Sequence, residues 1–122
     1  MNHPVRKLAL AALFAIVAAT ASAEDGVTAT EILLGGSNAV TGPVASACYA
    51  VTHGQLAHFK RVNDAGGVHG RKIRYEVLDD AYSAQRSIGN ARRLIQQDKV
   101  LALFGGCGTA TAAGILSVVD KS

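Results

Sequence analysis

The stretch Val100-Leu-Ala-Leu-Phe-Gly-Gly-Cys-Gly-Thr-Ala-Thr111 decides the fold. Its five opening apolar residues are typical of a parallel strand that is covered on both faces. The glycines after them stop the strand, and the alanine-rich segment from Thr109 to Val119 predicts a helix directly behind the glycines. The stretch therefore predicts a strand, a glycine turn and a helix in immediate succession.

The same order appears earlier in the chain. Glu31 to Gly36 is a short apolar run stopped by glycines, as in a buried strand, and a loop dense in turn formers follows from Ser37 to Pro43. Helical spacing then predicts a helix from Val44 to Asp64, ended by Ala65-Gly-Gly67. The large apolar residues expected on its buried face are Tyr49, Leu56, Phe59 and Val62.

A second strand and helix stand between these two units. Arg71 to Asp79 alternates apolar and polar residues, which is typical of a strand near the edge of a sheet. Asp80 or Ser83 can cap the helix that follows, because either side chain accepts a hydrogen bond from the free amides of a first turn. The apolar stripe expected on this helix consists of Ile88, Ala91 and Ile95.

Strands that alternate with helices over short connections predict an α/β fold, with three layers and a parallel sheet built from βαβ units. The edge-like second strand and the fully apolar third strand favour the strand order 2-1-3. Loops 38–43 and 105–109 then diverge at a topological switch point, where open α/β sheets bind ligands. The outer edge of the third strand is expected to be exposed and apolar, as in an unfinished sheet.

Residues 1–23 are predicted to be a secretory signal peptide. Arg6 and Lys7 precede an apolar run from Leu8 to Ala19, which is too short to span a membrane, and a small-x-small ending places cleavage after Ala23. The formal charge of the whole chain is +3. Without the leader's two cations the charge falls to +1, so the basic balance gives no support for a nucleic-acid partner.

The glycine turn Gly105-Gly-Cys-Gly108 leads into a helix start, where free amides and the hydroxyls of Thr109 and Thr111 can hold a carboxylate or phosphate. The alternative is a turn that only connects a strand to a helix. A dinucleotide fingerprint is incomplete because Thr111 stands where its third glycine belongs, and no Walker lysine follows.

Cys107 has two interpretations. On a sharp strand-to-helix turn it resembles the nucleophile of an elbow motif, although no histidine takes the position of its base. Alternatively, Cys48 at the start of the first helix lies at the same end of the sheet, and a disulfide between the two is compatible with an oxidising compartment.

The remaining polar residues predict structural roles. The basic clusters Lys60-Arg61 and Arg71 to Arg74 are interspersed with acids and indicate a solvated face. The histidines lack the spacing of metal ligands. Asp79-Asp80 is expected to cap the helix and hold the turn, rather than to bind a cation.

Several motifs together resemble the leucine/isoleucine/valine-binding proteins, the type I periplasmic binding proteins of ABC importers. Thr41-Gly-Pro43 follows the first strand and Asp79-Asp80 the second, while Leu103-Phe-Gly-Gly-Cys-Gly-Thr109 follows the third. The most specific element is Asn63-Asp-Ala-Gly-Gly-Val-His-Gly-Arg-Lys-Ile73. The resemblance covers residues 27–122 and corresponds to the first part of lobe one, so residues 24–122 are expected to be an incomplete lobe.

The resemblance implies that the carboxylate of a small solute is held by the turn at Cys107, Gly108 and Thr109. It places the first loop, including Thr41 and Gly42, on the same ligand, with Tyr49 near the position of an aromatic residue that covers the ligand in this family. In some members the equivalent of Cys107 pairs with a cysteine after the second strand, where this chain has Tyr82. Cys48 is then the available partner.

These observations predict a solute-binding component of an ABC importer, which binds a branched-chain amino acid, amide or related small carboxylate. It is expected to work in the periplasm as a monomer at full length, with a membrane permease as partner and without catalytic residues, cofactor, metal or nucleic acid. Residues 24–122 alone are expected to bind only weakly, because the second lobe would hold the rest of the ligand. The alternatives are the ectodomain of a sensor or receptor and a secreted cysteine hydrolase that uses Cys107.

Overall fold

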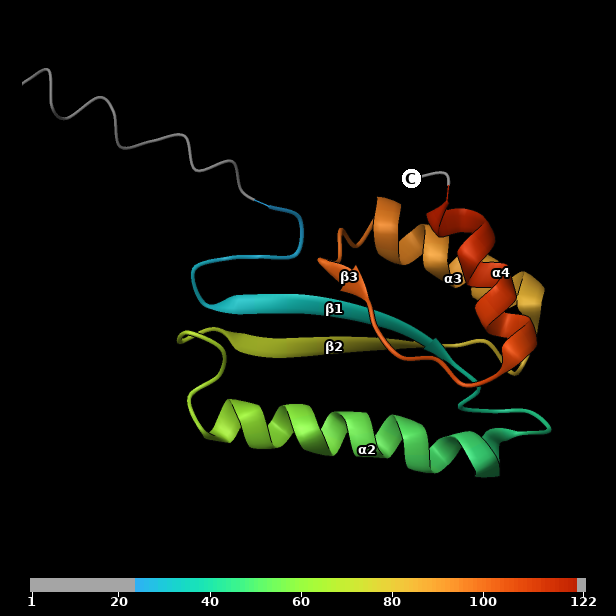
Figure 1. Ribbon diagram of the computed structural model, residues 1–122, viewed down its shortest axis with the longest axis horizontal. Coiled ribbons are helices and arrows are strands. Elements are labelled where there is room, and N and C mark those ends of the chain that lie inside the picture. Colours follow the sequence, from blue (N-terminus) through green and yellow to red (C-terminus); the bar gives the residue numbers. More distant parts are fainter. Residues whose placement is uncertain (1–23, 121–122) are drawn as a thin grey trace, which may run out of the picture.

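The computed structural model describes residues 24–120, so the predicted leader and its cleavage site lie outside the described part of the chain. The elements within it, shown in Figure 1, are strands β1 (Glu31–Asn38), β2 (Lys72–Asp79) and β3 (Ala102–Leu103) and helices α2 (Ala45–Asp64), α3 (Ala84–Gln96) and α4 (Thr109–Val119). Strands and helices alternate in the predicted order. The bounds of α4 coincide with the predicted ones, and Ser83 caps α3 by accepting a hydrogen bond from the Arg86 amide.

The three strands form a parallel sheet in the order β2-β1-β3, as predicted. The helix α2 covers one face of this sheet, and α3 and α4 lie together on the other face (Figure 1). The register of β1 and β2 pairs Glu31 with Lys72 and continues to Asn38 opposite Asp79. All three strands therefore end at the same edge of the molecule, where the predicted crevice belongs.

The central strand β1 packs differently on its two faces. Toward α3, Leu33 forms a buried cluster with Leu94 and Val100. Gly35 lies on this same face, and an added β-carbon there would come within 2.8 Å of a Leu94 methyl group. Leu94 therefore occupies the space that a side chain on β1 would fill, and brings α3 close to the sheet.

An aromatic cluster fills the space on the α2 side. The rings of Phe59, Tyr75 and Phe104 meet edge to face, with centroids 5.2 to 5.9 Å apart. Edge-to-face contacts of this kind are favourable because the positive ring edge meets the negative ring face. This cluster connects α2, β2 and the segment after β3, which are far apart in the sequence.

The predicted buried face of α2 is wrong in part. Tyr49 and Leu56 are exposed, by 61% and 41%, whereas Cys48, Thr52 and Phe59 are buried. One residue along a helix turns the side chain by about 100°, so a face centred on Cys48 turns Tyr49 away from the sheet. On α3 the fully buried positions are likewise Ser87, Ala91 and Leu94, rather than Ile88 and Ile95, which are half-buried.

The strand β3 is shorter and less covered than predicted. Its ladder with β1 comprises only Ala102 and Leu103, although the amides of Leu101 and Phe104 also donate to carbonyls of β1. Leu101 and Phe104 are exposed by 37% and 43%. The expected apolar outer edge is therefore present, while the expected cover on both faces is not.

The most family-specific motif, residues 63–73, is the connection between α2 and β2. The Asn63 side chain forms two hydrogen bonds with the backbone of one residue, accepting from Ile73 N at 2.7 Å and donating to Ile73 O at 2.8 Å. Gly67 has a φ of +80°, and an added β-carbon would lie 2.0 Å from the Arg71 carbonyl oxygen. The motif is thus a close-packed turn at the end of the sheet opposite the crevice.

Asp79 ties the loop after β1 to the end of β2. Its Oδ1 accepts hydrogen bonds from the amides of Val40, Thr41 and Ala81, and its Oδ2 accepts one from the Thr41 hydroxyl at 2.6 Å. The Thr41 hydroxyl is the main cause that lowers the pKa of Asp79 to about 2, assisted by the three amides and opposed by burial. The carboxylate form therefore holds the loop.

The Asn63→Ala variant should lower the free energy of unfolding by about 1–3 kcal/mol, because the partners of two partly buried backbone groups are lost. Urea titration followed by circular dichroism measures this change. Asp64→Ala is the matched control, since its exposed ion pair with Lys60 on the same helix contributes little. Equal effects of the two substitutions would contradict the role given to Asn63.

The Asp79→Asn variant should be less stable than the wild type at neutral pH, with a difference that shrinks as the pH falls. A group whose pKa is lowered on folding stabilises the native state above its unfolded pKa, here about 4, and loses this contribution as the pH falls toward about 2. Thermal unfolding between pH 7 and pH 2 measures the difference. A gap between the two proteins that stays constant over this range would refute the role of the carboxylate.

Candidate functional site

A disulfide lies at the carboxyl ends of the strands, where the ligand crevice is predicted. Cys48 at the start of α2 and Cys107 in the glycine turn are bonded, with their sulfurs 2.07 Å apart and their Cα atoms 5.7 Å apart. Of the two interpretations of Cys107, the structure contains the disulfide. A bonded sulfur is not a thiolate, so in this state neither Cys48 nor Cys107 offers the nucleophile that a cysteine hydrolase uses.

The turn between β2 and α3 contacts both loops that border the crevice. An added β-carbon at Gly42 would lie 2.9 Å from the Ala81 carbonyl oxygen, and one at Gly108 would lie 2.3 Å from Cε2 of Tyr82. Both glycines have positive φ values, +88° and +122°. The turn and the two loops therefore touch at positions where only glycine fits.

Polar side chains from α2 and β2 hold the start of the glycine turn. The Tyr75 hydroxyl lies 2.8 Å from the Phe104 carbonyl oxygen and 3.1 Å from Oε1 of Gln55. Burial raises the pKa of Tyr75, so the hydroxyl keeps its proton as a donor. The Gln55 side chain also lies against Gly105, where an added β-carbon would come within 2.2 Å of it. These contacts fix the backbone just ahead of the disulfide.

The start of α4 provides free backbone donors. The helix begins at Thr109, and its N-cap residue Gly108 has no side chain that could accept from the first amides. The first amide hydrogen bond of the helix reaches back from Ala112 to the Gly108 carbonyl. The amides before Ala112 thus have no partner within the helix, and the helix dipole favours an anion beside them.

The two threonines of this helix start differ in their availability. Thr109 is exposed. Thr111 is buried, and its hydroxyl lies 3.0 Å from the Gly108 carbonyl oxygen and 3.3 Å from that of Cys107. Because a hydroxyl has one proton to donate, Thr111 donates it within its own turn. The expectation that Thr111 contributes a hydroxyl to the anion is therefore wrong.

The expected residues of the first loop lie at different places. The Thr41 hydroxyl is taken by Asp79, and Gly42 lies against the β2–α3 turn. Tyr49 is exposed on α2, with its ring stacked on that of His53 at a centroid distance of 3.7 Å. The structure thus brings Gly42 and Gly108 to one turn, while Tyr49 extends into solvent beside the disulfide.

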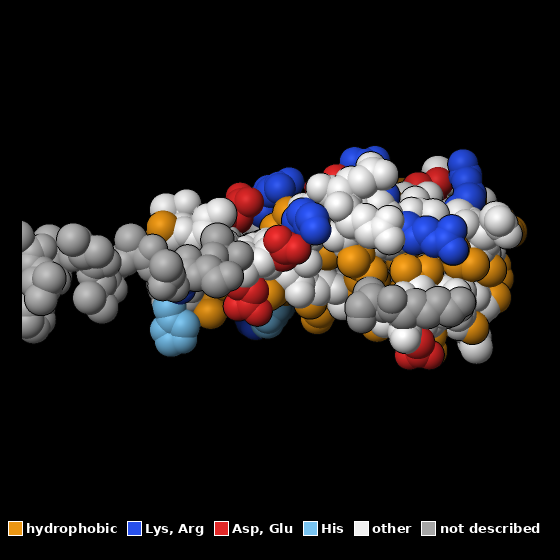
Figure 2. All heavy atoms as spheres, turned by 90° about the horizontal axis from the view of Figure 1, so that it is seen from above, with side chains coloured by type: hydrophobic (Ala, Val, Ile, Leu, Met, Phe, Trp, Pro, Cys, Tyr) orange, Lys and Arg blue, Asp and Glu red, His pale blue; other side chains and the backbone are white. Residues whose placement is uncertain are grey.

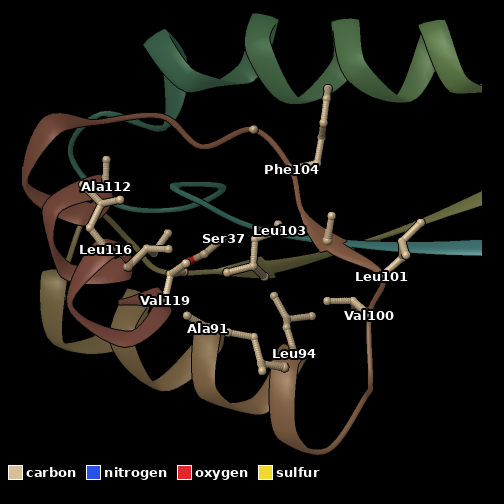
Figure 3. A pocket seen from close by; sticks show the side chains of 15 residues that line it. Ser37, Ala91, Leu94, Val100, Leu101, Leu103, Phe104, Ala112, Leu116 and Val119 are labelled. Atoms are coloured by element: carbon tan, nitrogen blue, oxygen red, sulfur yellow. The ribbon is translucent and has the colours of Figure 1, made fainter. Parts of the chain in front are cut away.

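A hollow lies on the face of β3 that α3 and α4 cover. It has a volume of about 530 Å³ and is bordered by β3, α3 and α4 (Figure 3). Ser37 has the only polar side chain among its lining residues, and Leu101, Phe104 and Leu116 on its rim are exposed. Figure 2 shows hydrophobic side chains reaching the surface in a band on the face formed by α3 and α4. This apolar groove is the exposed edge predicted for the third strand and lacks the polar groups that hold a small anion.

The chemistry available at the crevice is anion recognition by backbone donors. Within residues 24–120 no group of three or more His, Cys, Asp or Glu residues is placed to hold a metal ion. None of the helices in this part of the chain is long and apolar enough to cross a membrane.

Three residues of the site have no obvious sequence signal. Gln55 and Tyr75 support the glycine turn, and Tyr82 packs on Gly108. Gln55 is one polar residue of a long helix and Tyr75 one apolar position of a strand, so neither differs from its neighbours in the sequence. Tyr82 has one sequence signal, which is that it stands where some members of the resembling family have a cysteine.

Comparison with known proteins agrees with this architecture. The family model of periplasmic binding proteins matches residues 31–122. A Leu/Ile/Val-binding protein homologue from Brucella suis is 37% identical over 107 residues, which cover 86% of this chain and 27% of the relative. The structure of a possible leucine/isoleucine/valine-binding protein from Rhodopirellula baltica superposes with a TM-score of 0.71 at 29% identity, over 83% of this chain and 27% of that one.

A further solved structure, of a fatty acid ABC transporter substrate-binding protein from Thermomonospora curvata, has a TM-score of 0.69 at 28% identity. It covers 78% of this chain and 24% of that protein. The chain thus spans about a quarter of the length of the relatives that it matches. On the family match over residues 31–122, supported by the similar sequences and structures, the chain belongs to the periplasmic binding protein family, with the leucine/isoleucine/valine-binding proteins among its relatives.

Proposed function

We propose that this chain is the amino-terminal part of a solute-binding protein that captures a branched-chain amino acid, an amide or a related small carboxylate for an ABC importer, and that a carboxylate is the group held at the start of α4. The observation that carries the proposal is the start of α4, where unpaired amides follow a glycine N-cap at the switch point of the sheet. Backbone donors at such a point bind a carboxylate without a charged side chain.

The names of the relatives support a carboxylate as the shared feature of their ligands. The Brucella suis relative is named for leucine, isoleucine and valine, and the Thermomonospora curvata protein for fatty acids. Amino acids and fatty acids have unlike tails and the same acidic group. A lobe with similar architecture in both proteins is suited to bind that group, while the tail is recognised elsewhere.

The proposed ligand residues contribute through different groups. Cys107, Gly108 and Thr109 would offer backbone amides, and the exposed Thr109 hydroxyl is a further donor. Gly42 and Thr41 would border the ligand through their backbone, since the Thr41 hydroxyl is engaged by Asp79. Tyr49 is a candidate cover for the ligand because its ring is exposed beside Cys48.

We also propose a periplasmic location and a membrane permease as partner. Membership of the family supports a periplasmic location, a membrane permease as partner and a binding role without catalysis. The disulfide between Cys48 and Cys107 supports the same compartment, because such bonds persist in oxidising spaces. Arrival by a signal peptide at residues 1–23 and a monomeric state at full length remain predictions.

Calorimetric titration of the full-length exported protein tests the proposal, with L-leucine, L-isoleucine and L-valine as probes. Leucinol keeps the side chain and ammonium group of leucine and lacks its carboxylate, so it should bind at least about a hundredfold more weakly, as expected when buried donors lose a charged partner. Binding of leucinol as tightly as leucine would refute carboxylate recognition.

The Gly108→Ala variant should weaken binding of the same probes by at least about tenfold. The added methyl group meets the Tyr82 ring, and a φ of +122° is unfavourable for alanine, so the helix start must shift. Gly54→Ala is the matched control, since Gly54 lies on α2 with open space around it and alanine favours a helix. Unchanged affinity in Gly108→Ala would show that the start of α4 does not bind the ligand.

Replacement of both cysteines by serine should lower the free energy of unfolding by about 2–4 kcal/mol, because the bond closes a long loop in the unfolded chain. The bond joins residues 59 apart. Thermal unfolding of the double variant and of the reduced wild type should show equal losses. Mass spectrometry of periplasmic material without reductant must find no free thiol at either cysteine, and two free thiols would contradict the disulfide.

A further inference from the structure

Tyr82 is held in an unfavourable backbone conformation. Ala81 and Tyr82 have φ values of +47° and +64°, in the left-handed region that residues with side chains rarely adopt. Two carboxylates hold them there, since Asp79 accepts from the Ala81 amide and Asp80 from the Tyr82 amide. Such strain persists only where the surroundings enforce it, and it is concentrated at functional sites.

The position of the Tyr82 ring follows from this backbone. The ring packs on Gly108, where its Cε2 would lie 2.3 Å from an added β-carbon, and it therefore takes the space of a side chain at the N-cap of α4. The residue keeps an exposure of 38%, and it is not part of the buried cluster of Leu33, Leu94 and Val100. Core packing does not account for an aromatic ring in this place.

Two consequences follow for a ligand at the start of α4. Residue 108 can contact it only through the backbone, because the ring excludes a side chain there. The exposed part of the ring provides an apolar surface beside the amides that would hold the carboxylate.

We propose that Tyr82 is a specificity-determining residue, whose ring contacts the ligand next to its carboxylate and selects ligands with an apolar group there. The inference rests on the proposed function and adds to it a preference within the carboxylates. Leucine, which carries a branched apolar side chain, should accordingly be preferred to alanine, and the ring should account for part of that preference.

The test compares the affinities of L-leucine and L-alanine in the full-length exported protein by calorimetry. The Tyr82→Ala variant lacks the ring, so the ratio of its affinity for leucine to its affinity for alanine should fall by about tenfold, the effect of one well-packed aromatic contact. Tyr82→Asn is a second variant without the ring, chosen because asparagine tolerates the left-handed backbone and keeps the turn folded. Tyr82→Phe keeps the ring and should preserve the ratio.

Val68→Ala is the control, because this exposed apolar residue lies in the turn between α2 and β2. It should leave the ratio unchanged, and circular dichroism verifies that each variant is folded. If Tyr82 had a purely structural role, its replacement would weaken the binding of both ligands equally and leave the ratio of their affinities constant. That result would overturn the inference and leave the proposed function standing. If the wild type binds neither ligand nor the other branched-chain amino acids, the proposed function fails and this inference fails with it.

Discussion

The crevice depends on a pair of adjacent carboxylates at the end of β2. Asp79 binds the loop after β1 through two amides and a hydroxyl, and the turn into α3 through the Ala81 amide, while Asp80 is completely buried. Asp80 accepts from the Ser37 hydroxyl and from the Tyr82 amide, while its own amide donates to the Asn38 carbonyl. Two neighbouring residues thereby connect the end of β1, the loop behind it and the turn into α3. The buried side chain of Asp80 is tolerated because both of its oxygens accept hydrogen bonds.

Further ties extend this arrangement across the sheet. The disulfide attaches α2 to the glycine turn, and Tyr75 on β2 reaches under β1 to the Phe104 carbonyl. Gly36 makes that reach possible, since an added β-carbon would lie 2.1 Å from the Tyr75 hydroxyl oxygen. The loops around the crevice are thus fixed before any ligand arrives, which lowers the entropy cost of binding.

The order of elements, the strand order and the common edge at which the strands end could be predicted from the sequence, because each depends on local apolar patterns and on the rules of parallel sheets. The buried face of α2 could not. Size and hydrophobicity favour Tyr49 and Leu56, whereas the disulfide at Cys48 and the aromatic contacts of Phe59 determine which way the helix turns.

The fine structure of the site depends on contacts between distant residues. The hydroxyls of Thr41 and Thr111 suit a ligand when only residue types are considered, yet both are engaged within the protein. Tyr82 shows the converse, since its place beside Gly108 arises from two left-handed residues that no local pattern indicates. The sequence is compatible with two roles for Cys107, and the structure shows the disulfide because the neighbouring strands β1 and β3 bring the two cysteines together.

The amide of Asn63 has a consequence for how this sheet can be enlarged. By pairing with both backbone groups of Ile73, it acts as a substitute for one residue of a neighbouring strand at the outer margin of β2. Exposed Lys72 and Arg74 stand on either side of that position, and charges on a margin discourage the approach of another strand. The opposite margin, at β3, has neither a substitute nor a charge among Leu101, Ala102 and Leu103. The two margins of the sheet therefore differ, because an approaching strand would meet charges and the Asn63 amide at β2 and neither of these at β3.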